Sequence, residues 1–146
     1  MQNNDINWEL INRLNRDLKD GARLLSREEA RYLVDLYYQV QDLRTRAASQ
    51  GRTQDDASEP HALVTWLFDQ FHVLEKDVKK ALHTYADNQV PGIWAQSVHG
   101  IGPVISAGLL AHIDPQRADT AGSIWRFAGL DPTVGWGKGQ KRPWNA

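Results

Sequence analysis

Residues 98–110 read Val-His-Gly-Ile-Gly-Pro-Val-Ile-Ser-Ala-Gly-Leu-Leu, a tight glycine turn that opens directly into an apolar helix. Gly100 and Gly102 flank one apolar residue, so the backbone can turn sharply and approach another surface closely. The first N–H groups of the following helix have no partners inside it and lie at the positive end of its dipole. The stretch therefore predicts two helices joined by a turn that suits a phosphate.

Three other interpretations of this stretch compete with the phosphate-binding turn. A dinucleotide fingerprint needs a third glycine where Ile105 stands. A phosphate loop needs Gly-Lys-Ser or Gly-Lys-Thr, and neither occurs in the chain. An ordinary helix–helix turn with a glycine cap remains open. We interpret the stretch as a helix-hairpin-helix, which holds the DNA backbone without reading base sequence.

The residues expected to contact DNA lie in this turn, in the first turn of the following helix and in the basic tail. They are His99, Gly100, Ile101, Gly102, Val104, Ser106, Lys138, Lys141 and Arg142. Ile101 pins the turn to the core, His99 offers a donor to a phosphate, and the Ser106 hydroxyl can do the same. Each expected contact has a structural alternative. These are a capping or packing role for His99, a hydrogen bond of Ser106 within the start of its own helix, and a tail that contacts only solvent.

Upstream of the turn the sequence is helical. Apolar residues recur at helical spacing over residues 5–19, 27–49 and 60–87, with a polar connection at 50–60. Gly21 is expected to end the first helix, and Ser26 to cap the second. The second and third helices repeat steps of three and four, which predicts a long antiparallel, coiled-coil-like hairpin. Its seam can close within one chain or between two, and we expect a homodimer.

The whole chain is predicted to be all-α, because no strand pattern appears. We expect a helical region at 1–89, a compact helix-hairpin-helix domain at 90–132 and a basic, glycine-rich tail at 133–146. The break between the first two lies at residues 88–92, Asn-Gln-Val-Pro-Gly. A further helix is expected over about residues 119–128.

Composition narrows the function classes. The 146 residues have a formal net charge of −1 and no cysteine, which excludes disulfides, thiol catalysis and cysteine-bound zinc. His61, His72 and His83 recur every eleven residues and share one face of the expected third helix. Successive members lie about 16 Å apart along the helix axis, too far to bind one metal ion. We expect no cofactor and no metal. No apolar run could span a membrane and no signal peptide is recognisable, so a cytoplasmic protein without a membrane partner is expected.

Two linked motifs carry a family resemblance. Residues 100–104 read Gly-Ile-Gly-Pro-Val and 109–113 read Leu-Leu-Ala-His-Ile, and residues 127–132 follow as Phe-Ala-Gly-Leu-Asp-Pro. This pattern resembles the C-terminal domain of the insertion-sequence transposases whose recombination is guided by a bridge RNA. The resemblance covers about residues 90–132 and implies a DNA partner, leaves an RNA partner open, and implies a coiled coil before the domain.

The chain also departs from that family. Its members carry an N-terminal nuclease-like domain with metal-binding acids, whereas about ninety helical residues precede the turn here. They place a serine nucleophile after the second motif, where this chain has only Thr133. We therefore expect a transposase-related DNA-binding protein without catalysis of its own. The alternatives are a protein–protein interaction module that assembles through its helical hairpin, and a fragment of an active recombinase.

Overall fold

The computed structural model describes residues 8–54, 62–131, 133 and 135–140, and it is all-helical over this part of the chain, as predicted. Six helices follow one another: α1 (Trp8–Arg23), α2 (Arg27–Gln54), α3 (Ala62–Asp87), α4 (Val90–Ser97), α5 (Pro103–His112) and α6 (Ala121–Phe127). The chain forms two compact units, one up to His112 and one from Ile113 onward. In the described residues, no helix is long and apolar enough to cross a membrane.

The start of α2 follows from its sequence. The Glu29 N–H donates to Ser26 Oγ at 3.2 Å, and the Ser26 N–H donates to Glu29 Oε2 at 2.8 Å. This reciprocal pair is a capping box, and it confirms the predicted helix start at Ser26. The hydrogen bonds hold the pKa of Glu29 below its usual value.

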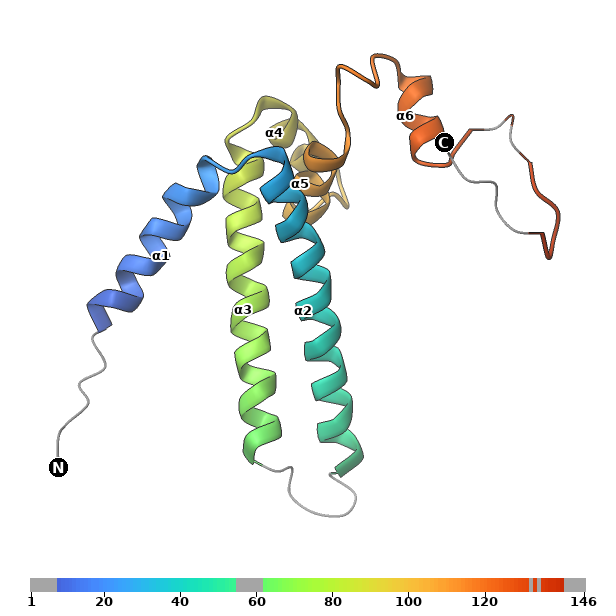
Figure 1. Ribbon diagram of the computed structural model, residues 1–146. Helices are drawn as coiled ribbons and strands as arrows, with labels where there is room; N and C mark the ends of the chain where they lie inside the picture. The colour runs from blue at the N-terminus through green and yellow to red at the C-terminus, as the bar shows by residue number, and fades with distance from the viewer. Residues whose placement is uncertain (1–7, 55–61, 132, 134, 141–146) are drawn as a thin grey trace, which may run out of the picture. The chain divides into compact units, whose positions relative to one another are not determined.

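Helices α2 and α3 lie side by side and antiparallel, and α4 and α5 lie at the end where α2 begins and α3 ends (Figure 1). The core is at this end. Its buried members come from three helices. They are Ala30, Val34 and Tyr37 of α2, Val78, Leu82, Tyr85 and Ala86 of α3, and Val104, Ala107 and Ala111 of α5. The small side chains of α5 let it pack closely against both long helices.

A polar cluster around Glu75 lies between α2 and α3 where this core ends. The Tyr37 hydroxyl donates to Glu75 Oε1 at 3.2 Å, and Gln41 Nε2 donates to the same oxygen at 3.4 Å. Arg44 forms an ion pair with Glu75 Oε2. Burial raises the pKa of Glu75, but the bonds and charge of Arg44, with Gln41 and Tyr37, outweigh it and hold this pKa below its usual value.

Three predicted helix boundaries were wrong. Helix α1 passes through Gly21 and ends at Arg23, and α2 continues beyond its predicted end at residue 49 to Gln54. Helix α4 begins at Val90, so Pro91 and Gly92 lie in its first turn rather than in a break. Proline fits there because first-turn N–H groups have no partners inside the helix. The predicted start of the third helix at Pro60 lies outside the described residues.

Gly92 has a packing role. A Cβ on Gly92 would lie 2.1 Å from the Ala86 carbonyl oxygen, so only glycine lets α4 approach the end of α3 this closely.

Candidate nucleic-acid interface

The turn between α4 and α5 is tight and closed by its own backbone. The Val98 N–H donates to the Ala95 carbonyl at 3.1 Å, and the Ile101 N–H donates to the Val98 carbonyl at 3.1 Å. Gly100 has φ 90°, a backbone conformation that residues other than glycine rarely adopt. His99 and Gly100 are exposed, and Ile101 and Gly102 are half-buried. The tip of the turn therefore presents mainly backbone.

The start of α5 leaves amides outside the helical ladder. The first hydrogen bond runs from the Ser106 N–H to the Gly102 carbonyl at 2.9 Å. Pro103 has no N–H, so the amides of Val104 and Ile105 precede the ladder at the positive end of the helix. A Cβ added at Gly102 would meet nothing within 4 Å, so the space in front of this residue is open.

Two of the predicted contact residues face inward. Val104 is buried, and Ser106 is fully buried with its hydroxyl donating to the Gly92 carbonyl at 3.1 Å. The Ser106 hydroxyl is therefore not presented to a phosphate. It joins the start of α5 to the first turn of α4 and so fixes the two helices on either side of the turn.

The turn has no formally charged neighbours in sequence. From Val90 to Ile113 the chain contains no Asp, Glu, Lys or Arg, and His99 and His112 are the only titratable side chains. A phosphate at the turn would meet backbone dipoles rather than cations. The segment from 90 to 113 therefore adds no formal charge to the predicted interface, and the nearby carboxylate of Asp87 in α3 accepts from Gln96 Nε2 of α4 at 2.9 Å.

The second unit contains α6, and its two ends are capped. The Thr120 hydroxyl accepts from the Ser123 N–H at 3.2 Å, which caps the start. At the other end the Leu130 N–H donates to the Trp125 carbonyl at 2.8 Å, and the Gly129 N–H donates to the Arg126 carbonyl at 3.1 Å. With Gly129 at φ 72°, this is a Schellman motif. The second family-like motif thus forms a helix end.

Asp131 is held by its neighbours just after this cap. Its Oδ1 accepts from the Thr133 hydroxyl at 2.6 Å and from the Thr133 N–H at 2.9 Å, and its Oδ2 accepts from Arg126 Nε at 3.3 Å. The bonds from Thr133, then that from Arg126, hold the pKa of Asp131 below its usual value. The carboxylate therefore ties Thr133 to the end of α6.

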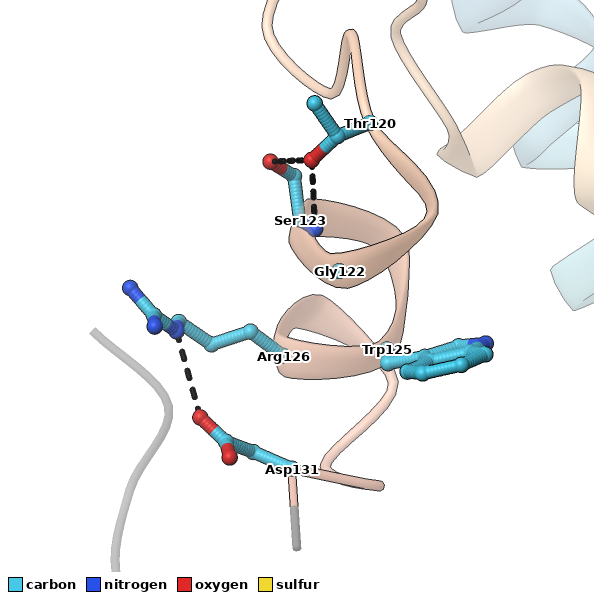
Figure 2. Close-up of a pocket in the computed structure, with 6 residues that line it drawn as sticks. All are labelled: Thr120, Gly122, Ser123, Trp125, Arg126 and Asp131. Carbon is cyan, nitrogen blue, oxygen red and sulfur yellow. Dashed lines mark hydrogen bonds and ion pairs between the residues drawn. The ribbon is translucent and has the colours of Figure 1, made fainter. Parts of the chain in front are cut away.

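Arg126 and Asp131 border an open hollow of about 260 Å³, shown in Figure 2. Thr120, Gly122, Ser123 and Trp125 complete its lining. The sequence alone does not reveal this hollow, because the Arg126–Asp131 pair depends on how the chain turns after α6. Among the described residues, no three His, Asp or Glu side chains come together to hold a metal ion.

The predicted tail contacts are placed only in part. Lys138 is exposed in the second unit, and Lys141 and Arg142 lie outside the described residues. The hairpin turn belongs to the first unit. The structure therefore gives the geometry of the turn and of Lys138 separately.

Comparison with known proteins relates part of the chain to a family. No curated protein and no solved structure matches the chain. The model of the transposase IS116/IS110/IS902 family matches residues 94–138, which run from α4 through the turn, α5 and α6 to Lys138. This segment, less than a third of the chain, is therefore related to that transposase family.

Proposed function

We propose that this chain is a transposase-related DNA-binding protein that contacts the phosphate backbone through the α4–α5 turn and does not itself cut or join DNA. One observation carries the proposal. An exposed glycine turn and the unbonded first amides of α5 lie together inside the segment that matches the transposase family. Backbone amides contact phosphates and read no base edge, so binding should show little sequence preference.

The charge around the turn sets the strength of this binding. Because residues 90–113 carry no lysine or arginine, the cations come from elsewhere, with Lys138, Lys141 and Arg142 as candidates. We expect weak binding with a shallow salt dependence, on the order of two to four released ions. Phosphates are common to DNA and RNA, so an RNA partner would use the same turn. Competition of labelled DNA by unlabelled RNA measures this.

Gly102 gives the clearest test of the turn. Gly102→Val places a side chain in open space, so the fold should persist while a phosphate can no longer approach the backbone. Gly21→Val is the matched control, because a Cβ at Gly21 also meets nothing within 4 Å and Gly21 lies far from the turn in the sequence. Fluorescence anisotropy with a labelled duplex should show at least severalfold weaker binding for Gly102→Val only. If the two folded variants bind the duplex with equal affinity, the proposed phosphate contact at the turn is wrong.

The expectation that the chain does not cut or join DNA rests on its hydroxyl groups, which could otherwise act as nucleophiles. The described serines near the turn and in α6 are engaged locally: Ser97 with the Trp94 carbonyl, Ser106 with the Gly92 carbonyl and Ser123 with Thr120. The Thr133 hydroxyl donates to Asp131. We expect no strand cleavage and no covalent adduct with supercoiled DNA. A protein–DNA adduct on a denaturing gel would overturn this, and mapping it would name the reacting residue.

The α2–α3 hairpin supports a second candidate function, assembly with another copy. Several large apolar side chains on the second half of α2 and the first half of α3 are exposed. They are Leu43, Leu63, Trp66, Leu67, Val73 and Leu74. Two helices alone cannot cover this surface, and a second hairpin would. A dimer would also place two α4–α5 turns on one DNA and strengthen a weak contact.

Phe71→Asp tests the dimer. Phe71 is half-buried on α3 among these residues, and the exposed residue Thr65, which lies on another face of α3, provides the control Thr65→Asp with the same added charge. Light scattering should show dissociation for Phe71→Asp only, with weaker DNA binding, while circular dichroism monitors helix content. A native protein that is strictly monomeric at micromolar concentration, with DNA binding intact, would exclude the dimer.

A further inference from the structure

A tight turn in the second unit places a cationic residue at its corner. The Gln140 N–H donates to the Gly137 carbonyl at 3.0 Å, and the Gly137 N–H donates to Gln140 Oε1 at 3.0 Å. Gly139, the third residue of this turn, has φ 87°, the positive angle that a type II turn requires at that position. Lys138 is the second residue, so it lies at the corner of a turn that its neighbours close.

An aromatic residue lies directly before this turn. Trp136 is 48% exposed, and Lys138 is exposed as well. Two residues of extended chain span about 7 Å, so the indole ring and the ammonium group are close enough to contact neighbouring parts of one nucleic-acid strand. We call residues 136–140 the tail turn.

The charge of the second unit fits an anionic partner. From Ile113 onward the sequence contains five lysines and arginines and three acids, whereas the first unit contains twelve lysines and arginines and fifteen acids. After Asp131 there is no acid, and Lys138 is followed by Lys141 and Arg142. The positive charge of the unit is therefore concentrated in the part of the sequence that contains the tail turn, where it attracts phosphates.

The composition of the tail turn favours a nucleic-acid strand over a protein surface. Among the described residues from 133 to 140, Trp136 is the only large apolar residue, and three glycines alternate with its neighbours. Protein interfaces bury several apolar side chains at their centre. A nucleotide needs less, because its base stacks on one aromatic ring and its phosphate meets a nearby cation. Bases of a duplex already stack on one another, so an unpaired base is the one that offers its face.

We propose that the tail turn binds an unpaired nucleic-acid strand, with Trp136 stacked on a base and Lys138 paired with a phosphate of that strand. The inference rests on the proposed function in one respect, namely that the partner is a nucleic acid. It adds a contact made by side chains to the backbone contact proposed for the α4–α5 turn. The segment that matches the transposase family ends at Lys138 and so includes both residues, which supports their assignment to the same partner.

The experiment measures fluorescence anisotropy with the full chain and three labelled probes of equal length: an oligothymidylate, an oligouridylate and a DNA duplex. Trp136→Ala should weaken binding of the single strands by about tenfold, because one base–aromatic stack is lost, and should weaken duplex binding much less. Trp136→Phe should recover most of the affinity. Tyr32→Ala is the control, because Tyr32 is an aromatic residue of α2 with 66% exposure.

Lys138→Gln tests the phosphate contact. The variant lacks one cation, so the slope of log affinity against log salt concentration should become shallower by about 0.7 for a single strand. Lys79→Gln is the matched control, because Lys79 is an exposed lysine on α3 in the first unit. If both variants change the slope equally, the total charge of the chain sets the salt dependence and the phosphate contact of Lys138 is wrong.

The outcomes for Trp136 separate stacking from packing within protein. A loss of single-strand affinity in Trp136→Ala that phenylalanine restores supports the inference, and the tighter of the two single strands identifies the partner as DNA or RNA. An equal loss for single strands and duplex, or no loss, overturns it. A lower melting temperature or a changed mass of Trp136→Ala would mean that the ring packs against protein, which also overturns it.

The same measurements distinguish this inference from the proposed function. If Gly102→Val weakens duplex binding and Trp136→Ala leaves single-strand binding unchanged, the contact at the α4–α5 turn stands and the tail-turn contact fails. If Trp136→Ala weakens single-strand binding and Gly102→Val changes nothing, the tail-turn contact stands and the α4–α5 contact fails. If the native chain binds none of the three probes, both fail.

Discussion

The two ends of the α2–α3 hairpin share one spacing of apolar residues and differ in what they bury. We call residues 30–40 with 78–86 the proximal half, and residues 43–50 with 62–74 the distal half. The proximal half contains fully buried residues such as Ala30 and Leu82, whereas none of the described side chains of the distal half is buried. Leu67, in the distal seam, is 36% exposed.

The difference comes from a third layer. Helix α5 packs on both α2 and α3 at the proximal end and supplies Val104, Ala107 and Ala111 to the core. No described helix covers the distal seam in the same way. A heptad-like pattern thus identifies the face that needs a partner, but the length of the covering element decides how much of that face is buried.

The largest expected effect comes from truncating matched leucines in the two halves. Leu82→Ala should lower the free energy of unfolding by about 2–5 kcal/mol, because Leu82 is fully buried. Leu67→Ala should cost about 1 kcal/mol or less, because Leu67 already contacts water. Urea unfolding followed by circular dichroism measures both, at a concentration where light scattering shows monomer. Equal costs in the monomer would break the comparison.

A smaller effect on stability tests how closely α4 approaches the end of α3. Gly92→Ala should lower the free energy of unfolding by about 1–3 kcal/mol, because the new Cβ would overlap the Ala86 carbonyl. Gly108→Ala is the control within α5: its Cβ would lie 3.7 Å from Val34 Cγ1, an ordinary contact. This control should be neutral or stabilise by up to about 1 kcal/mol through helix propensity. Thermal melts of both variants check the pair, and an unaffected Gly92→Ala would show that α4 can move away.

The smallest expected effect on stability comes from Glu75, which lies between the proximal and distal halves of the hairpin. The pKa of Glu75 is lowered in the folded chain, so its contribution is present above the ordinary value of 4.5 and is lost as pH falls through the folded pKa. Glu75→Gln should therefore lower stability near neutral pH, by about 1 kcal/mol, and lose less stability between neutral and acid pH than the native chain. Urea midpoints across this range measure the difference. If the urea midpoints of both proteins fall in parallel as pH is lowered, Glu75 does not contribute to the loss of stability in acid.

Sequence reasoning succeeded where local chemistry determines the structure. Ser26 and Glu29 form a capping box from neighbouring residues alone, and the spacing of α2 and α3 predicted both helices. The glycine turn was also readable, because Gly100 adopts a conformation that disfavours other residues.

The errors came from contacts between one helix and another, which local patterns do not reveal. Pro91 and Gly92 looked like a break, but Gly92 packs against Ala86 and α4 begins before it. Ser106 looked like a phosphate ligand, yet its hydroxyl meets the Gly92 carbonyl in the core. The exposure of Trp94 was equally hidden, since nothing in the local pattern says which side of α4 is covered.

The capped end of α6 has a consequence for what a family likeness can convey. Gly129 and Leu130 meet the geometric demands of a helix that must stop and reverse, and Asp131 ties down the chain that follows. None of these demands involves a reacting group. A match to this motif therefore conveys how a helix ends, and it does not by itself convey a reaction.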